Sequence, residues 1–203
     1  MSLKFYTNPM SRGQIARWAL HEAGVEYDEK IVAFDNEMKS ADFLAVNPMG
    51  KVPAIVHNGK TVTECAAICA YLADTFPDAG LAPTADERAD YYRWLFFVAG
   101  PIEQAVTDRS FGVVIAEEQQ RMAGYGNYNM AMDVLDQMLQ TNDYVCGKRF
   151  TMADVYVGAQ VGWGLAFKSF PERGSFKAYA ERVQSRSAYI EAKAIDEKLI
   201  PQG

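Results

Sequence analysis

The residues with the clearest chemical potential lie in the stretch from Asn47 to Tyr71, NPMGKVPAIVHNGKTVTECAAICAY. Pro53 stands at the start of an expected strand, and because proline donates no ladder hydrogen bond, neighbouring backbone groups are expected to pair with something other than the sheet. Glu64 and Cys65 stand at the start of the next helix, where free amides favour an anion and lower the pKa of a thiol. The stretch therefore indicates a binding site in which a ligand forms hydrogen bonds with backbone groups and with the free amides at the helix start.

Other chemistries have little support in the residue inventory. The three cysteines, Cys65, Cys69 and Cys146, are too few and too unevenly spaced for a disulfide framework. The two histidines, His21 and His57, have no metal-ligand spacing. We therefore expect no metal, and we expect Cys69 and Cys146 to be buried thiols.

The composition and net charge limit the classes of protein to which this chain can belong. The chain has 203 residues, 49% of them apolar and 23% charged, and is long enough for two small domains. Its net charge of -6 and pI of about 5.0 lack the basic footprint of a nucleic-acid binder. No apolar run approaches the roughly 20 residues of a membrane helix, and the sequence opens without a leader pattern. We expect a cytoplasmic protein that holds any small anion with a few local cations and backbone amides.

The first part of the chain alternates between strand and helix patterns. The expected elements are a strand over 3–7, a helix over 11–24 capped by Ser11, a strand over 25–34, a helix over 36–46, a hairpin from 52 to 63 and a helix from 64. Strands that alternate with helices and finish in a hairpin predict a mixed sheet with helices on both sides.

The second part has almost no strand signal. Residues 77–83, PDAGLAP, read as a turn-rich linker. Helices are then expected over 84–100, interrupted at Gly100-Pro101, and over 117–141, 151–167, 175–184 and 188–199. We therefore expect one domain over 1–77, a linker over 78–84 and an all-helical domain over 85–203.

This order of elements, with the motifs NPMGKVPAI, TECAAICAYLAD and RFTMADVYVGAQVGWG, resembles the cytosolic glutathione S-transferase family and most closely a bacterial branch. The resemblance covers essentially the whole chain. It implies a thioredoxin-like N-terminal domain of order βαβαββα, followed by an all-α C-terminal domain that carries the electrophile site. It also implies glutathione as co-substrate, no metal and usually a homodimer.

The resemblance assigns several residues to glutathione. In the family, a cis peptide before Pro53 turns the backbone of Val52 outward, so that its amide and carbonyl pair with the cysteinyl part of glutathione as an added strand. Lys51 aligns with a Lys or Gln that lies toward the glycyl end, and Lys39 aligns with a basic residue of similar role. Both lysines can equally be solvated surface side chains.

Glu64 and Cys65 are implied to hold the γ-glutamyl end. The acid takes the ammonium group, and the amide of the next residue takes the carboxylate. Relatives usually carry serine at the position of Cys65, so the hydroxyl contact is in doubt while the backbone contact is retained. The alternatives are a plain helix-start acid for Glu64 and a redox role for Cys65.

The implied chemistry needs a glutathione thiolate. Lowering a thiol pKa by ~2 units from about 8.5 takes about 2.7 kcal/mol of preferential thiolate stabilisation. One hydroxyl donor and the first turn of a helix can supply that amount. Serine- or cysteine-using branches carry the donor where Ser11 stands, and tyrosine-using branches where Tyr6 stands. The spacing of the segment 8–11 matches neither pattern cleanly, and the alternative is that Ser11 only caps a helix and Tyr6 only packs. Of the two hydroxyls, Ser11 is favoured over Tyr6.

Two further groups complete the sequence predictions. Thr151 and Asp154 have the spacing of a capping box, so Asp154 is expected to act in folding and not in catalysis. The electrophile site is expected to be apolar, with candidates in Met10 and in one face of the long helix at i, i+4 and i+7. Those candidates are Met10, Phe96, Gly100 and Glu103.

The sequence thus predicts a glutathione transferase that conjugates glutathione to small apolar electrophiles. Within the same chemistry, the alternative is glutathione-dependent peroxide or thiol reduction, which could run through Cys65. From another class, the alternative is a non-catalytic ligand-binding or interaction module. The intact cluster of Val52, Pro53 and Glu64 favours a retained glutathione site.

Overall fold

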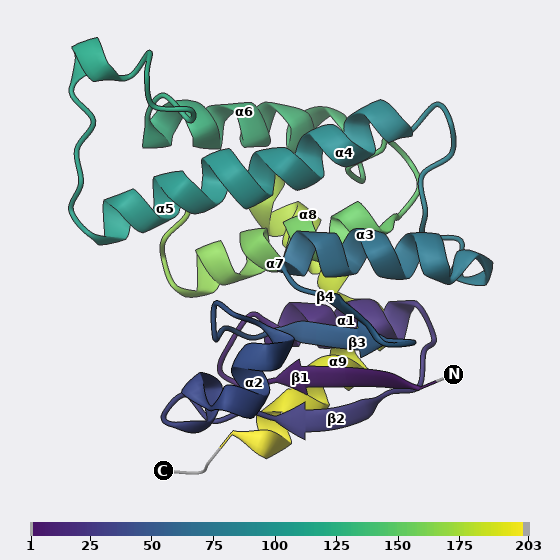
Figure 1. Ribbon diagram of the computed structural model, residues 1–203. Helices are drawn as coiled ribbons and strands as arrows, with labels where there is room; N and C mark the ends of the chain where they lie inside the picture. Colours follow the sequence, from purple (N-terminus) through teal and green to yellow (C-terminus); the bar gives the residue numbers. More distant parts are fainter. Residues whose placement is uncertain (1, 201–203) are drawn as a thin grey trace. The chain divides into compact units, whose positions relative to one another are not determined.

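The computed structural model describes residues 2–200, which divide into two compact units (Figure 1). The sheet unit contains the residues up to Ala82 together with those from Ser185 onward, and the helical unit runs from Pro83 to Gln184. This division differs from the expected domains at one end of the chain. The last helix, α9 (Ser187–Leu199), belongs to the sheet unit because it packs against α1 (Gly13–Glu22).

The sheet unit has a four-stranded mixed sheet in the order β2-β1-β3-β4. The pair β1–β2 is parallel, whereas β1–β3 and β3–β4 are antiparallel, with Tyr6 opposite Ala54. This confirms the thioredoxin-like order of strands and helices that the sequence predicts. The elements are β1 (Leu3–Thr7), α1, β2 (Asp28–Ile31), η1 (Glu37–Lys39), α2 (Ala41–Val46), β3 (Ala54–His57), β4 (Lys60–Val62), α3 (Cys65–Thr75) and η2 (Pro77–Ala79).

Two elements of this unit are shorter than the sequence pattern suggests. The second strand covers only Asp28–Ile31, although 25–34 is expected to be extended. The expected helix over 36–46 is divided at Ser40, whose backbone is extended and whose Oγ accepts a hydrogen bond from the Phe43 amide at 3.3 Å. Because Ser40 caps a new helix, the turn before it remains a separate 3-10 turn.

The helical unit is built from α4 (Arg88–Phe97), α5 (Glu103–Ser110), α6 (Tyr128–Thr141), α7 (Met152–Ala166) and α8 (Gly174–Gln184), with a short 3-10 turn, η4 (Glu117–Gln119). Between α4 and α5 the chain forms a single π-helical turn, η3 (Val98–Ile102), which contains Pro101. The expected interruption at Gly100-Pro101 is therefore a widened turn that accommodates the missing proline N–H.

The expected helix over 117–141 is wrong in its first half. Helix α6 begins only at Tyr128, after Asn127, whose Oδ1 accepts a hydrogen bond from the Met130 amide at 2.9 Å. Gly126 just before it has a φ of +67°, which a helix cannot include. Residues 111–127 therefore form an irregular segment that projects from the helical unit, as Figure 1 shows in teal between α5 and α6.

No helix among residues 2–200 is both long and apolar enough to cross a membrane.

Candidate functional site

The sheet unit carries two Asn-Pro-Met segments, and the first of them shapes the loop before α1. Asn8 is buried, its Oδ1 accepts a hydrogen bond from the Met10 amide at 3.0 Å, and its Nδ2 donates to the Val32 carbonyl at 3.0 Å. An asparagine that accepts from the amide two residues on forms an Asx turn. Asn8 therefore fixes the loop that leads to Ser11.

The second segment repeats this arrangement before β3. The Oδ1 of Asn47 accepts from the Met49 amide at 3.1 Å, and its Nδ2 donates to the Lys51 carbonyl at 2.7 Å. Its side chain thus spans the turn that precedes Val52. Neither asparagine is among the residues predicted for the site, although the repeated Asn-Pro-Met pattern is visible in the sequence and marks turns.

The peptide between Val52 and Pro53 is cis, as the resemblance implies. Strand β3 begins only at Ala54, and the backbone N–H and C=O of Val52 form no hydrogen bond with another residue in the described part of the chain. The Val52 side chain packs with Tyr6 against a small buried cluster of Val32, Met38 and Phe43. The side chain is thus anchored, while the backbone groups are left for another partner.

The two predicted lysines have different surroundings. Lys39 Nζ donates to the carbonyls of Met49 and Gly50 at 3.1 and 3.2 Å, so it ties η1 to the turn before Val52. Gly50 has a φ of +58°, and a Cβ there would lie 2.7 Å from Lys39 Nζ, so only glycine permits this approach. Lys51 is exposed and forms no ion pair with any described carboxylate, so its charge is available for an anion.

Glu64 has an uncommon backbone conformation at the start of α3, with a φ of 64° and a ψ of 115°. Such positions persist where the surroundings enforce them, and they gather at ligand-binding sites. The Glu64 side chain does not cap this helix, and the start of a helix is a place where N–H groups can bind an anion. The Cys65 thiol is 8% exposed, and its Sγ lies 3.6 Å from the Arg12 carbonyl. The thiol therefore links the starts of α3 and α1.

Ser11 is a half-buried residue whose hydroxyl is hydrogen bonded at both ends. Its Oγ donates to the Asn8 carbonyl at 2.7 Å and accepts from the Gly13 amide at 2.9 Å. A Cβ on Gly13 would collide with Thr7 Oγ1, so glycine allows α1 to start this close to β1. An amide that donates to a hydroxyl makes that hydroxyl a better donor.

Tyr6 lies at the end of β1, and its ring packs on Phe43 with centroids 5.8 Å apart. Its hydroxyl forms no hydrogen bond with another described residue. Both candidate hydroxyls thus belong to the same unit as Val52 and Glu64, Ser11 in a hydrogen-bonded turn and Tyr6 in an apolar cluster.

The candidates for the electrophile site divide between the units. Met10 belongs to the sheet unit and is 56% exposed, whereas Phe96 belongs to α4 and is 73% exposed. Gly100 and Glu103 line a cavity of about 370 Å³ within the helical unit, at the π-helical turn, together with Tyr125. The carboxylate of Glu103 accepts from Gln160 Nε2 at 2.6 Å, so one wall of this cavity is polar. Phe96 does not line this cavity.

Asp154 has the structural role that the sequence predicts. Its carboxylate completes a capping box with Thr151, accepting from that residue's amide at 2.8 Å and hydroxyl at 3.0 Å. It also accepts from the Val145 amide at 2.7 Å and the Tyr179 hydroxyl at 2.8 Å. Burial raises the pKa of Asp154 to about 6.

Comparison with known proteins identifies this arrangement. Residues 1–74 match the family model described as Glutathione S-transferase, N-terminal domain. Glutathione S-transferase GstA of Escherichia coli is 28% identical over 173 residues, which cover 82% of this chain and 84% of that protein. A solved glutathione transferase from Methylococcus capsulatus has a TM-score of 0.78 at 29% identity, over 97% of this chain and 99% of its own. The first 74 residues thus match the N-terminal domain of glutathione S-transferases, and the chain as a whole is similar to solved glutathione transferases.

A further solved relative of this transferase carries the co-substrate. The glutathione S-transferase of a sphingomonad, complexed with glutathione, is 28% identical with a TM-score of 0.76, over 96% of this chain and 98% of that one. These similarities confirm the class of enzyme predicted from the sequence, a glutathione transferase. Within the described residues, no group of three or more His, Cys, Asp or Glu side chains is arranged to hold a metal ion.

Proposed function

We propose that this transferase joins the thiolate sulfur of glutathione to small apolar electrophiles. The observation that carries the proposal is the backbone of Val52, which precedes a cis proline and leaves an amide and a carbonyl without a partner among the described residues. An extended peptide can add to such an edge as a strand, through main-chain hydrogen bonds. Glutathione is a peptide of the right length for this short edge.

The remaining contacts are proposed to hold the charged groups of glutathione. The positive end of the α3 dipole suits the γ-glutamyl carboxylate, and the exposed carboxylate of Glu64 suits its ammonium group. Lys51 is the better candidate for the glycyl carboxylate, because its ammonium group is not engaged by a described carboxylate. Lys39 acts instead through the turn that it holds before Val52.

Ser11 is proposed to hold the sulfur as thiolate. Without a ligand, the Ser11 hydroxyl donates to the Asn8 carbonyl, which carries no charge. Such a hydrogen bond contributes about 0.5–1.5 kcal/mol net to stability. A hydrogen bond to a charged acceptor contributes about 1.5–3 kcal/mol. A thiolate would therefore win the proton from the carbonyl, and the amide of Gly13 would go on supporting the Oγ. Tyr6 remains the second candidate.

The electrophilic acceptor is proposed to bind in the helical unit, next to its π-helical turn η3. The cavity at Gly100 and Glu103 is the physical support for this placement. Its polar wall favours acceptors that add a hydrogen-bonding group to an apolar body. Phe96 is an exposed apolar side chain of the same unit, and Met10 remains a candidate from the sequence alone. A homodimer is part of the proposal, and sedimentation velocity measures it.

The two hydroxyls are separated by comparing Ser11→Ala with Tyr6→Phe in a conjugation assay with a chloro-nitroaromatic. Loss of one thiolate donor lowers turnover by about 10², so Ser11→Ala is expected to fall by that factor and Tyr6→Phe by much less. The pKa of bound glutathione, measured by thiolate absorbance, should rise only in Ser11→Ala. Full activity in Ser11→Ala would reject the assignment.

Thermal stability and peroxide reduction, measured beside conjugation, test the competing functions. Thermal stabilisation by glutathione without any product would favour a binding module over a transferase. For thiol reduction, the burial of Cys65 and its contact with the Arg12 carbonyl favour a positioning role for the thiol. Unchanged peroxide reduction in Cys65→Ser would agree with that role.

A further inference from the structure

Thr7, at the end of β1, has a buried hydroxyl group without a hydrogen-bond partner. The side chain is 0% exposed, and its Oγ1 has no donor or acceptor among the described residues. The Thr7 carbonyl, by contrast, accepts from the Val32 amide at 2.8 Å. A buried hydroxyl without a partner costs free energy, so its presence in a native fold calls for an explanation.

This hydroxyl lies beside the oxygen atom that is proposed to hold the sulfur of glutathione. Three oxygen atoms converge on the bare face of Gly13, and they are the nearest atoms that a Cβ there would meet. They are Thr7 Oγ1, Ser11 Oγ and the Asn8 carbonyl oxygen. Such a Cβ would collide with the first and would lie 3.0 and 3.1 Å from the other two. The lack of a side chain at this position therefore lets the three oxygen atoms lie around one point.

The hydrogen bonds of Ser11 leave room for one further donor. A hydroxyl group has one proton and two acceptor sites. The Ser11 hydroxyl donates its proton to the Asn8 carbonyl at 2.7 Å, and the Gly13 amide fills one acceptor site at 2.9 Å. Among the described residues, no other group donates to Ser11 Oγ. The second acceptor site is therefore open to a neighbouring hydroxyl.

The proposed function changes this arrangement when the thiolate binds. Once the Ser11 proton turns to the sulfur, Ser11 Oγ and the Asn8 carbonyl oxygen would lie 2.7 Å apart with no proton between them. Lone pairs at that distance repel each other, and this repulsion opposes the turn. A new donor to Ser11 Oγ offsets the repulsion, and it also makes the remaining O–H a stronger donor to the sulfur.

We infer that Thr7 is a positioning residue for the thiolate, whose hydroxyl donates to Ser11 Oγ when Ser11 donates to the sulfur. In this state Ser11 accepts from Thr7 and Gly13, and the buried hydroxyl of Thr7 has an acceptor. The Asn8 carbonyl keeps the Ser11 amide as a donor at 3.1 Å. The inference rests on the proposed role of Ser11, because Thr7 acts only through that residue.

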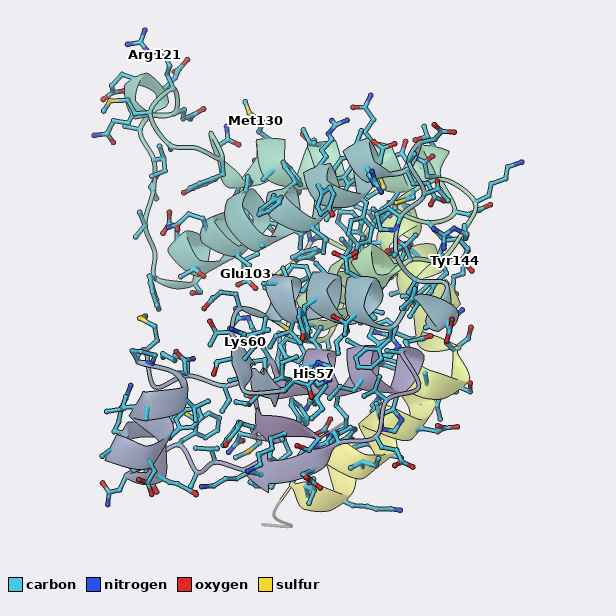
Figure 2. The ribbon with its side chains drawn as sticks, turned by 45° about the vertical axis from the view of Figure 1, so that its right-hand side comes forward. His57, Lys60, Glu103, Arg121, Met130 and Tyr144 are labelled. Atoms are coloured by element: carbon cyan, nitrogen blue, oxygen red, sulfur yellow. The ribbon has the colours of Figure 1, made fainter. Side chains whose placement is uncertain are left out.

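Thr7→Val and Thr7→Ser separate the hydroxyl from the shape of the side chain. Valine keeps the shape and removes the hydroxyl, whereas serine keeps the hydroxyl and removes a buried methyl group. Thiolate absorbance measures the pKa of bound glutathione, and urea unfolding measures the stability of the ligand-free protein. Thr61→Val is the matched control, because Thr61 is an exposed threonine on the edge strand β4, next to Lys60, which Figure 2 labels.

The two variants of Thr7 should have opposite effects. Thr7→Val should raise the pKa of bound glutathione by about 0.4–1 unit, the equivalent of one neutral hydrogen bond. It should nevertheless unfold at an equal or higher urea concentration, because it loses a hydroxyl that has no partner in the ligand-free protein. Thr7→Ser should keep the pKa of bound glutathione and unfold at a lower urea concentration, because a buried methyl group is lost. Thr61→Val should leave the pKa of bound glutathione unchanged.

A double variant identifies the path of the effect. In Ser11→Ala, adding Thr7→Val should cause no further rise in the pKa of bound glutathione, because the acceptor is already gone. A further rise of full size would overturn the inference, and so would an unchanged pKa in Thr7→Val beside a raised pKa in Ser11→Ala. If Ser11→Ala itself leaves the pKa unchanged, the proposed role of Ser11 is wrong, and this inference fails with it.

Discussion

Asn8 and Asn47 show how much of the candidate site depends on residues that touch no ligand. Each places its Oδ1 on the amide of the methionine two residues later and its Nδ2 on a carbonyl, that of Val32 or Lys51. The first holds the loop that carries Ser11, and the second holds the loop that presents Val52. We interpret both as positioning residues.

Replacing Asn47 with alanine should raise the KM for glutathione several-fold and change kcat at saturation little. The reason is that the turn before Val52 loses two part-buried side-chain hydrogen bonds. Steady-state kinetics with glutathione as the varied substrate measures the effect. Asn36→Ala is the control, because Asn36 caps no helix with its side chain. An equal change in both variants would contradict the positioning role.

Lys51→Met should also raise the KM for glutathione, by about three- to tenfold, because it removes one exposed charge near the ligand. An interaction between exposed charges weakens with ionic strength. The difference between Lys51→Met and the unchanged protein should therefore shrink when KM is measured at high salt. A difference that does not depend on salt would indicate that Lys51 acts through packing.

At the scale of the element, the start of helix α7 is fixed by the contacts of Asp154. The carboxylate of Asp154 accepts hydrogen bonds from two backbone amides and two hydroxyls, and one of them comes from Tyr179 on α8. The capping box alone would contribute on the order of 1–2 kcal/mol. The two further contacts make Asp154 a junction between α7, α8 and the preceding loop.

Asp154→Ala should therefore lower the free energy of unfolding by about 3–5 kcal/mol, because it leaves several buried donors without an acceptor. Urea unfolding followed by circular dichroism measures this loss. Asp90→Ala is the control, because Asp90 is an exposed acid in the first turn of α4, and its loss should cost less than about 1 kcal/mol. A small effect in Asp154→Ala would show that water replaces the carboxylate.

The raised pKa of Asp154 predicts that the free energy of unfolding depends on pH. The folded pKa of Asp154 is raised to about 6 from an ordinary 3.8, so the folded protein holds this proton more tightly than the unfolded chain does. The contribution is full below about pH 3.8 and is lost as the pH rises through about 6. Relative to Asp154→Asn, the unchanged protein should therefore gain stability, by at most about 3 kcal/mol, between pH 7 and pH 4.

At the scale of the whole molecule, the C-terminal helix α9 completes the sheet unit. Arg17 on α1 is 1% exposed, and its Nε lies 3.0 Å from Asp196 Oδ1 on α9. The same guanidinium contacts Glu29 and donates to the Tyr27 hydroxyl at 2.9 Å. The C-terminal helix is thus tied by a buried ion pair to α1, the helix that follows the loop carrying the candidate serine.

Asp196→Ala should destabilise the protein by about 3 kcal/mol, because it leaves a buried guanidinium with one carboxylate partner fewer. The double variant Arg17→Met with Asp196→Leu should recover part of that loss, since a well-packed apolar pair can replace a buried ion pair. Glu197→Ala is the control on the same helix, in an exposed pair with Lys193. Thermal unfolding that gives equal losses in Asp196→Ala and the double variant would contradict this account.

The sequence by itself determined those features whose signals act over a few residues. The hairpin within 52–63, the capping box of Thr151 and Asp154, and Pro53 just before β3 are local features, so their positions could be predicted. The order of strands and helices in the sheet unit follows from the same local patterns. The motif at Val52 and Glu64 then led to the glutathione site through its resemblance to a family.

Only the tertiary structure decided the features that depend on contacts between distant residues. Asn8 reaches Val32, Asp154 reaches Tyr179, and Arg17 reaches Asp196, so the partner of each side chain is 24 or more positions away. No local pattern encodes such a pairing, because it depends on which faces of the elements come together. For the same reason α9 was expected among the helices of the second domain, whereas its apolar face and Asp196 find their partners on α1.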